Sequence, residues 1–595
     1  MTAQLARKIE PTPTGGDALV AEMRRRLQER FGTTTGGSGS SGGAVANTTG
    51  YLSMPSLELA AEHCIGRIVA IEGAKLVVMI EIDDPKAQLD MSESLQVGCV
   101  VKVPTKSSVA FGMVNALSIA KPAAGGKGAE TRFLELELVG ESVTVGTGKG
   151  ANMRRGVSTY PILGSPVYAA TQADLRFVFV RDGPQSARIG SIQQDPNLPA
   201  QVNVDDLLGK HFAVLGATGT GKSCAVTLIL KAILKRNPNG HVLLLDPHNE
   251  YARAFGDQAN VIDLHKLQLP HWLFNFTELR AVLTNAGASI SNVEAALLND
   301  LITQAKRQFL GQAAENRYIT SDTPTPYRIG QVGEYIEDVL GRLDKPESIA
   351  QYQALKTAIV TLQNDARFGF MFGKGVTTRD LMVPILSSIF RVPVEGKPIT
   401  ILDLSGVPFE ILNVVVSVLC RTAFDFATWS RGKWPILLVC EEAHLYAPEN
   451  PEAGFEPTKR VLARIAKEGR KYGLSLGIAS QRPAELAATM LSQCSTIFAM
   501  RLTHERDQQW VRSSLSDGIV GLLEALGSLG TAEAIGVGEG IVMPMRLVFD
   551  TLPPEERPRS ATASFSTAWK NDGAGDREKL QEVVDHWRRQ RHDDD

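Results

Sequence analysis

The chain has 595 residues, of which 43% are hydrophobic, and 62 basic against 65 acidic residues give a formal net charge of -3. This composition is typical of a globular protein of several domains, and it excludes a surface that attracts nucleic acid through a general excess of positive charge. The 6 cysteines form no CxxC pair, which argues against disulfides or zinc and favours a cytoplasmic location. No apolar run approaches the ~18 residues of a membrane span, so we expect no membrane contact.

The amino-terminal part is predicted to hold a flexible arm and a small β-barrel. Residues 1–55 contain the segment TTTGGSGSSGG, a composition typical of flexible coil. Between about 56 and 180, short runs rich in Val and Ile, such as KLVVMIEI and RFLELELVG, alternate with Gly, Pro and Lys. This spacing predicts a small β-barrel, in which no catalytic set of residues stands out.

An alternation of strand and helix patterns predicts that the rest of the chain has an α/β fold. Apolar runs such as FAVLG, HVLLLD, PILLVC and LSLGIAS are typical of buried parallel strands. We expect two parts of one core, 181–276 and 381–550, separated by a helical insertion at 277–380 where strand patterns disappear. The second part ends in a predicted hairpin, EAIGVGEGIVMPMRLVF, and a polar C-terminal tail with one helix follows at 551–595.

The segment GATGTGKS follows a predicted strand and matches the P-loop pattern that binds nucleoside triphosphates. Lys222 is expected to reach the β- and γ-phosphates of ATP, while the hydroxyl of Ser223 binds Mg²⁺. The alternative is an anion-binding turn without hydrolysis. The residues predicted to contact ATP are Gly216, Ala217, Thr218, Gly219, Thr220, Gly221, Lys222, Ser223 and Cys224, with Lys210 before the strand as a further contact.

Acidic residues follow two other predicted strands. Glu441 and Glu442 end the run ILLVCEE; we expect Glu441 to hold Mg²⁺ through water and Glu442 to polarise the attacking water. P-loop ATPases more commonly have aspartate at the first of these two acidic positions. The side chain of Glu441 is one methylene longer, so its contact with the metal would be less direct. The run HVLLLDPHNEY brings Asp246, His248 and Glu250 to a ligand-binding edge. Of these we predict only Asp246 as a second acid; the alternative for the glutamates is two solvated acids after an edge strand.

Gln481 and a basic helix complete the candidate site. Gln481 follows the run LSLGIAS, where it can bind the γ-phosphate or the attacking water, or serve only as a polar turn residue. The helix RVLARIAKEGRKYG is basic at one end. In a ring of identical subunits Arg470, with Lys467 as the alternative, could stabilise charge on a neighbour's γ-phosphate as an arginine finger. A solvated charged face is the simpler interpretation.

These segments, together with RRGVSTYPILGSPVY, ILDLSGVP and LSQCSTIFAMRLTHERDQ, resemble the bacterial branch of the HerA family, which is related to FtsK. The resemblance covers about 60–550 and implies an α/β RecA-like P-loop core preceded by a HAS-type β-barrel. It also implies a homohexamer with ATP between subunits and double-stranded DNA in the pore. In the family Lys222, Asp246, Glu442, Arg470 and Gln481 would be the P-loop lysine, the accessory acid, the catalytic glutamate, the trans-acting finger and the sensor.

The resemblance implies an ATP-hydrolysing ring motor that translocates on double-stranded DNA. It would work with a NurA-like nuclease in repair, or with a sirtuin-like or nuclease effector in antiphage defence. One alternative is a hexameric ATPase scaffold that regulates an effector with little translocation, and another is a conjugation or secretion ATPase. The candidate pore loops are residues 367–374 and 459–460, with a solvated surface as the alternative for each.

Overall fold

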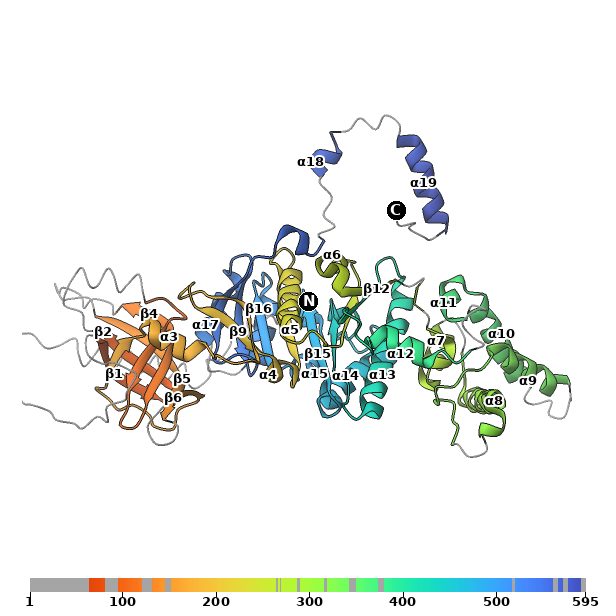
Figure 1. The fold of residues 1–595 in the computed structure, drawn as a ribbon, viewed down its shortest axis with the longest axis horizontal. Helices are drawn as coiled ribbons and strands as arrows, with labels where there is room; N and C mark the ends of the chain where they lie inside the picture. The colour runs from red at the N-terminus through yellow and green to blue at the C-terminus, as the bar shows by residue number, and fades with distance from the viewer. Residues whose placement is uncertain are drawn as a thin grey trace, which may run out of the picture.

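A computed structural model describes most of the chain. The described residues are 64–80, 95–119, 131–144, 151–263, 266–267, 269–285, 289–314, 318–341, 349–372, 379–515, 520–559, 565–570 and 576–589. They form a barrel, an α/β sheet and a group of helices arranged in a row along the long axis (Figure 1). The predicted arm, residues 1–55, lies outside the described residues.

A 7-stranded antiparallel sheet forms the amino-terminal domain. Because β2 pairs with both β1 and β5, the sheet closes into a barrel, as the sequence predicted. Inward-facing residues such as Ile68, Val101 and Leu134 are buried, as expected when alternate residues along each strand face the interior. The strands are β1 (Cys64–Glu72), β2 (Lys75–Ile80), β3 (Val100–Pro104), β4 (Val109–Ile119), β5 (Arg132–Thr144), β6 (Ala151–Arg155) and β7 (Pro166–Ala169).

An 11-stranded sheet forms the α/β core, in the order β12-β13-β11-β14-β15-β10-β16-β17-β18-β8-β9. The strands from β12 to β16 in this order are parallel, and those from β17 onwards join antiparallel. Their bounds are β8 (Ser186–Ile192), β9 (Pro199–Asn203), β10 (Phe212–Leu215), β11 (Val242–Asp246), β12 (Ala259–Asp263), β13 (Ile399–Asp403), β14 (Ile436–Cys440), β15 (Leu474–Ser480), β16 (Thr496–Met500), β17 (Glu533–Gly538) and β18 (Met545–Phe549). The predicted hairpin is confirmed as the antiparallel pair β17 and β18.

Helices cover both faces of the parallel strands, because alternate strand residues enter two different cores. In β10, Ala213 and Leu215 pack in a core with α13 (Phe409–Ser430) and α14 (Glu456–Glu468). Phe212 and Val214 pack in a second core with α5 (Lys222–Arg236). Among the described residues, α13 alone is long and apolar enough to cross a membrane, but 78% of its apolar window is buried inside the protein, as in a core helix.

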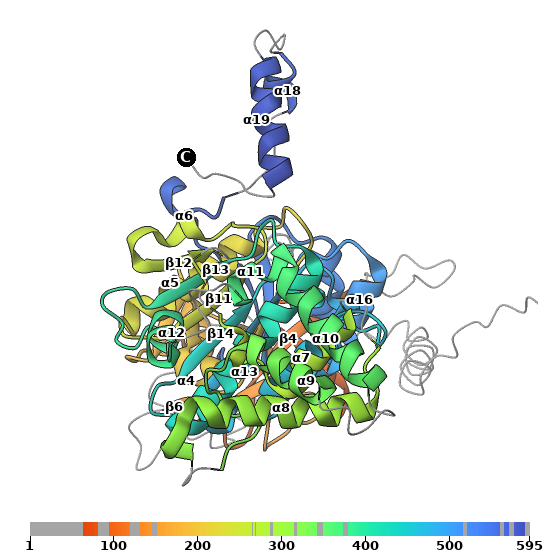
Figure 2. The ribbon, with the colours of Figure 1, turned by 90° about the vertical axis from the view of Figure 1, so that its right-hand side faces the viewer.

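The segment between β12 and β13 is helical, as the strand-free pattern predicted. Its helices pack their apolar faces against the core that holds α13 and form the green group in Figure 1, which faces the viewer in Figure 2. Arg421 of α13 fixes the first of them by an ion pair of 3.0 Å with Glu278. The helices are α7 (Phe276–Asn285), α8 (Asn292–Leu310), α9 (Ile329–Gly341), α10 (Ile349–Asn364), α11 (Gly369–Phe372) and α12 (Met382–Phe390).

Short helices connect the strands, and two more follow the core. The C-terminal helices α18 and α19 stand apart from the rest of the molecule in both views (Figures 1 and 2). The remaining bounds are α3 (Gln172–Phe179), α4 (Val204–Leu208), α6 (Ala252–Phe255), α15 (Ala488–Leu491), α16 (Glu505–Ser514), α17 (Val520–Glu524), α18 (Phe565–Ala568) and α19 (Asp576–Arg589).

Candidate nucleotide-binding site

The P-loop connects β10 to α5 at the carboxyl end of the parallel strands. Gly219 and Gly221 have φ values of 77° and 96°, which glycine adopts at little cost. At Gly216 space is the constraint, because an added Cβ would lie 2.8 Å from the Cβ of Met500. Helix α5 begins at Lys222 without a side-chain cap, so its first N–H groups can bind an anion. The backbone geometry is therefore that of a phosphate-binding loop.

Lys222 is buried between the loop and the two predicted acids. Its Nζ donates to Oε1 of Glu441 and, at 2.6 Å, to Oε1 of Glu442. Burial alone would lower the pKa of this ammonium, but the charges of the two carboxylates outweigh burial and hold the pKa above its usual value. Lys222 therefore carries a full positive charge at the point where the loop faces β14.

Glu442 combines a strained backbone with an ionised side chain. Its φ of 48° and ψ of 48° lie in the left-handed region, which is costly for a residue with a Cβ and is concentrated at functional sites. Oε2 lies 3.3 Å from Nδ1 of His444 and accepts the backbone N–H of Gln481 at 3.3 Å. Burial would raise the pKa of Glu442, but the charge of Lys222 and these contacts lower it. The carboxylate is thus available to accept a proton.

The turn after β11 contributes two residues to the site. Ser223 Oγ donates to Oε2 of Glu250 at 2.5 Å, and the hydroxyl of Tyr251 donates to Oε2 of Glu441 at 2.6 Å. We predicted no role for Glu250 or Tyr251. Their position in the DPHNEY turn, at the carboxyl end of a parallel strand, was the signal that could have revealed them.

Asp246 is fully buried at the start of this turn. It accepts backbone N–H groups from His248 at 3.2 Å and Tyr251 at 2.9 Å. Burial raises its pKa to about 6, although these hydrogen bonds act against the shift. The structure therefore shows Asp246 shaping the turn that presents Glu250, while its predicted role as an accessory acid stays a prediction.

Ser223, Glu250 and Glu441 supply oxygen atoms beside the loop, since Ser223 bonds to Glu250 and Glu441 bonds to Lys222. Mg²⁺ takes oxygen ligands and keeps several waters beside one or two carboxylates and the substrate phosphates. The hydroxyl and carboxylates present here fit that requirement. Glu250 joins Ser223 and Glu441 as a candidate at the metal site.

Gln481 lies between the P-loop strand and the strand that carries the acids. It follows β15, which pairs with β10 on one side and β14 on the other. This confirms that it follows a strand adjacent to the acid-bearing strand. Its Oε1 accepts the hydroxyl of Thr218 from the P-loop, so its side chain faces the loop; the role of a sensor stays a prediction.

Lys210 and Arg470 lie at the opposite end of the sheet from their own P-loop. Lys210 precedes β10 and pairs with Glu539, and Arg470 lies in the short turn Gly469–Tyr472 before β15. The length of β10 and its flanking residues separates this edge from the loop by roughly 15 Å. Arg470 and the alternative Lys467 are exposed. These cations could therefore contact a nucleotide only on another subunit.

The first candidate pore segment, 367–374, is only partly described. Arg367 pairs with Asp365 at 2.7 Å on the surface, and residues 373–378 fall outside the described residues. Its role in gripping DNA stays a prediction.

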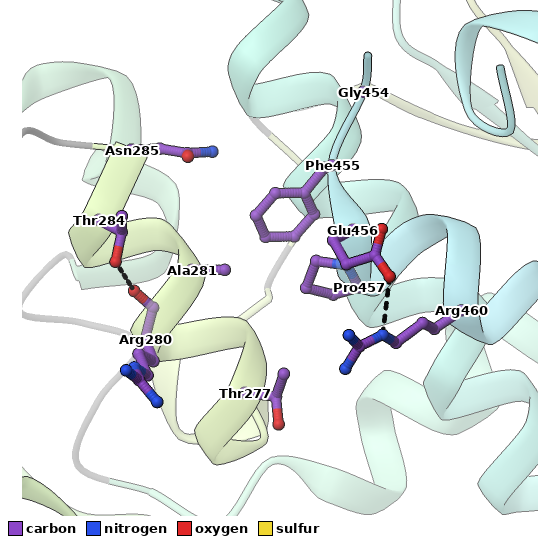
Figure 3. Close-up of a pocket in the computed structure, with 10 residues that line it drawn as sticks. All are labelled: Thr277, Arg280, Ala281, Thr284, Asn285, Gly454, Phe455, Glu456, Pro457 and Arg460. Carbon is purple, nitrogen blue, oxygen red and sulfur yellow. Dashed lines mark hydrogen bonds and ion pairs between the residues drawn. The ribbon is translucent and has the colours of Figure 1, made fainter. Parts of the chain in front are cut away.

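The second candidate, Lys459 and Arg460, lies at the start of α14. Both side chains pair with Glu456, at 3.2 Å and 2.8 Å. Arg460 also lines an open pocket of about 350 Å³ between α7 and α14 (Figure 3). The pocket lining is Thr277, Arg280, Ala281, Thr284, Asn285, Gly454, Phe455, Glu456, Pro457 and Arg460.

The sequence is similar to a known family of helicases. The family model "Helicase HerA, central domain" matches residues 187–423, from β8 through the P-loop into α13. The DNA double-strand break repair helicase HerA of Pyrococcus furiosus is 28% identical over 422 residues, covering 64% of this chain and 72% of that protein. The helicase of the same name from Saccharolobus solfataricus is 27% identical over 399 residues, covering 66% of this chain and 73% of that protein.

Two solved structures are similar in outline. VirB4 of Thermoanaerobacter pseudethanolicus has a TM-score of 0.47 at 14% identity and covers 63% of this chain and 99% of its own. The bacterial conjugative coupling protein TrwB has a TM-score of 0.39 at 14% identity and covers 64% of this chain and 95% of its own.

Proposed function

Because the chain belongs to the HerA helicase family, we propose that it is a homohexameric ring motor that hydrolyses ATP to translocate on double-stranded DNA. The P-loop and its acids, with the HerA relatives, make it an ATP-dependent enzyme of the P-loop class. The ring, the movement on DNA and the partner proteins are the proposed parts.

One observation supports the proposed ring: the candidate residues fall into two groups at opposite ends of the parallel strands of one sheet. Lys222, Glu442 and Gln481 lie at the carboxyl end, whereas Lys210 and Arg470 lie at the amino end. A single subunit cannot bring both groups to one triphosphate. Head-to-tail contact between copies would complete the site, and such contacts form a ring when the rotation between successive copies closes.

The chemistry follows from the carboxyl-end residues. Backbone N–H groups of the loop and Lys222 hold the β- and γ-phosphates, and the carboxylate of Glu442 takes a proton from the water that attacks γ-phosphorus. As that P–O bond forms, the bond to the β–γ bridging oxygen breaks and ADP leaves. Mg²⁺, when held by Ser223 and near Glu250 and Glu441, would neutralise phosphate charge. Arg470 from the neighbouring subunit stabilises the charge on the transferred group.

A partner would supply any DNA cleavage. The HerA relatives are named for DNA double-strand break repair, and we propose a NurA-like nuclease, or a sirtuin-like or nuclease defence effector, beside this motor. Contacts to DNA would be local and salt-sensitive, given the net charge of -3. We place the protein in the cytoplasm, where its scattered thiols stay reduced.

The test combines ATP turnover with movement on DNA. We expect linear duplex DNA to stimulate phosphate release and the protein to displace a triplex-forming strand from that duplex. Lys222→Ala should abolish both activities while native mass spectrometry still detects the ring, because the ammonium binds phosphate rather than the subunit contact. Hydrolysis retained by Lys222→Ala would refute the phosphate-binding assignment.

A scaffold that regulates an effector is the second candidate, and one contact favours it. Arg155 of barrel strand β6 donates to the carbonyl of Val542 at 2.9 Å and to those of Gly538 and Ile541. The same loop carries Glu539, which pairs with Lys210. A protein docked on the barrel could thus alter ATP turnover. Turnover that ignores DNA but responds to a co-purified protein would select this candidate over the motor.

A further inference from the structure

His211 is a buried side chain that joins three parts of the core beside the amino-end cations. It precedes β10 and is only 3% exposed. Its Nε2 lies 3.0 Å from the carbonyl oxygen of Ala466 in α14, and its Nδ1 accepts the backbone N–H of Leu476 in β15 at 2.9 Å. Its own carbonyl accepts the N–H of Ser495 before β16 at 3.1 Å.

These contacts fix the protonation of the imidazole. Because the N–H of Leu476 donates to Nδ1, that nitrogen carries no proton, and Nε2 must carry the hydrogen that it donates to Ala466. The ring is therefore neutral, and burial lowers its pKa, assisted by the charge of Arg470. A neutral imidazole that makes both hydrogen bonds has one orientation, and it holds α14 and β15 at a fixed separation.

The same ring connects the chain segments of the two candidate trans cations. Lys210 is its neighbour in sequence, and the Lys210 carbonyl accepts the hydroxyl of Ser495 at 2.9 Å. Arg470 follows Ala466 by one helical turn and precedes β15, so both bonds of the imidazole bracket the turn that carries Arg470. Displacement of the ring would change the spacing between the two cations without touching the P-loop acids.

We infer that His211 is a positioning residue that holds Lys210 and Arg470 in one arrangement, so that both reach a neighbouring subunit's triphosphate together. This inference rests on the proposed function, in which the site is shared. It goes beyond that proposal because it assigns His211 to the face that supplies Lys210 and Arg470 to the neighbouring subunit. From its sequence position, just before the strand that leads into the P-loop, His211 would instead be assigned to the subunit's own site.

Mixed rings test which face His211 serves. His211→Phe keeps a planar aromatic side chain of similar shape and removes both side-chain hydrogen bonds. Alone, it should lower turnover by at least about tenfold and leave the Kd for a fluorescent ATP analogue within about twofold, a ratio worth under 1 kcal/mol. Mixed with Glu442→Gln subunits it should regain activity, because its intact P-loop then meets intact cations. Mixed with Arg470→Ala subunits it should regain none, because every interface then lacks a correct cation pair.

The reference pair separates the two claims. Arg470→Ala mixed with Glu442→Gln must regain activity if the site is shared. Failure of this pair in rings verified as mixed would contradict the proposed function and this inference with it. If the pair recovers but His211→Phe is rescued by Arg470→Ala rather than by Glu442→Gln, only the inference about His211 is overturned.

A second variant covers the case in which His211→Phe does not fold. Gln at this position offers an amide oxygen to the N–H of Leu476 and an amide N–H to the carbonyl of Ala466. His211→Gln should therefore keep turnover within about threefold of the wild type, since a change of that size is under 1 kcal/mol. A His211→Gln ring that folds and binds the analogue normally but loses turnover like Arg470→Ala, and is not rescued by Glu442→Gln, would also overturn the inference.

Discussion

At the scale of single residues, the site is a small set of buried charges that balance one another. Lys222 lies between Glu441 and Glu442, and the left-handed backbone of Glu442 turns its carboxylate toward Lys222, His444 and Gln481. Removing Lys222 would leave two neighbouring carboxylates without a counter-charge, which is unfavourable for buried groups. The position of each acid thus depends on the lysine as much as on its own strand.

The proximity of Lys222, Glu441, Glu442 and Gln481 could be predicted from sequence, because each follows an apolar run typical of a parallel strand. The contacts of Glu250 and Tyr251 could not, since they depend on the path of the turn after Asp246. That path is set by hydrogen bonds from backbone N–H groups to a buried carboxylate, which leave no periodic pattern in the sequence.

The buried imidazole of His271 should make the stability of the protein depend on pH. It stacks on Phe372 with ring centroids 5.0 Å apart and is fully buried. Burial lowers its pKa from 6.5 to about 4. His271 therefore binds a proton near pH 6.5 in the unfolded chain but only near pH 4 in the folded protein. The free energy of unfolding falls as the pH drops through this window.

The matching measurement is thermal unfolding between pH 7 and pH 4.5. His271→Phe should lose less stability over this range than the wild type, by on the order of 2 to 3 kcal/mol. His504→Asn is the control for loss of a histidine, because His504 is exposed and makes no capping hydrogen bond. Equal slopes for His271→Phe and the wild type would contradict the assignment.

At the scale of elements, the sheet shows which strands a sequence pattern can reveal. Strands such as β10, β11 and β14 are buried along their whole length, so they are continuous apolar runs and were predicted. The edge strand β12 and the strand pair β8 and β9 were missed. Each carries polar residues among its apolar ones, as in SARIGSI, and includes positions that are not buried, so none is a continuous apolar run.

The loop after β17 gives a prediction at this scale, because it joins the barrel to the edge that carries Lys210. Gly538 has a φ of 115°, and an added Cβ would lie 1.9 Å from the carbonyl oxygen of Ser495. Gly538→Ala should therefore cost about 3 kcal/mol of stability and should lower turnover by displacing Glu539.

Differential scanning calorimetry and phosphate release check this loop together. Gly183→Ala is the matched control, since a Cβ there meets nothing within 4 Å, and its stability should change by less than about 0.5 kcal/mol. Equal Tm values for the two variants would show that the loop is not as constrained as its backbone indicates.

At the scale of the whole molecule, the barrel, the sheet and the helical insertion lie in a row (Figure 1). The two ends of the parallel strands carry different groups. The carboxyl end carries the P-loop and the acids, and the amino end carries Lys210, His211 and Arg470. The placement of these groups at opposite ends follows from sequence, because acids that follow strands and cations that precede them must lie at opposite ends. How copies of the chain meet does not follow from one sequence.

The measurement that tests this account most directly is turnover per subunit across a dilution series, with the oligomeric state followed by mass photometry. We expect turnover to fall by about a thousandfold as rings dissociate, since each separated P-loop loses the cation supplied by its neighbour. A folded monomer that hydrolyses ATP at the undiluted rate would contradict it.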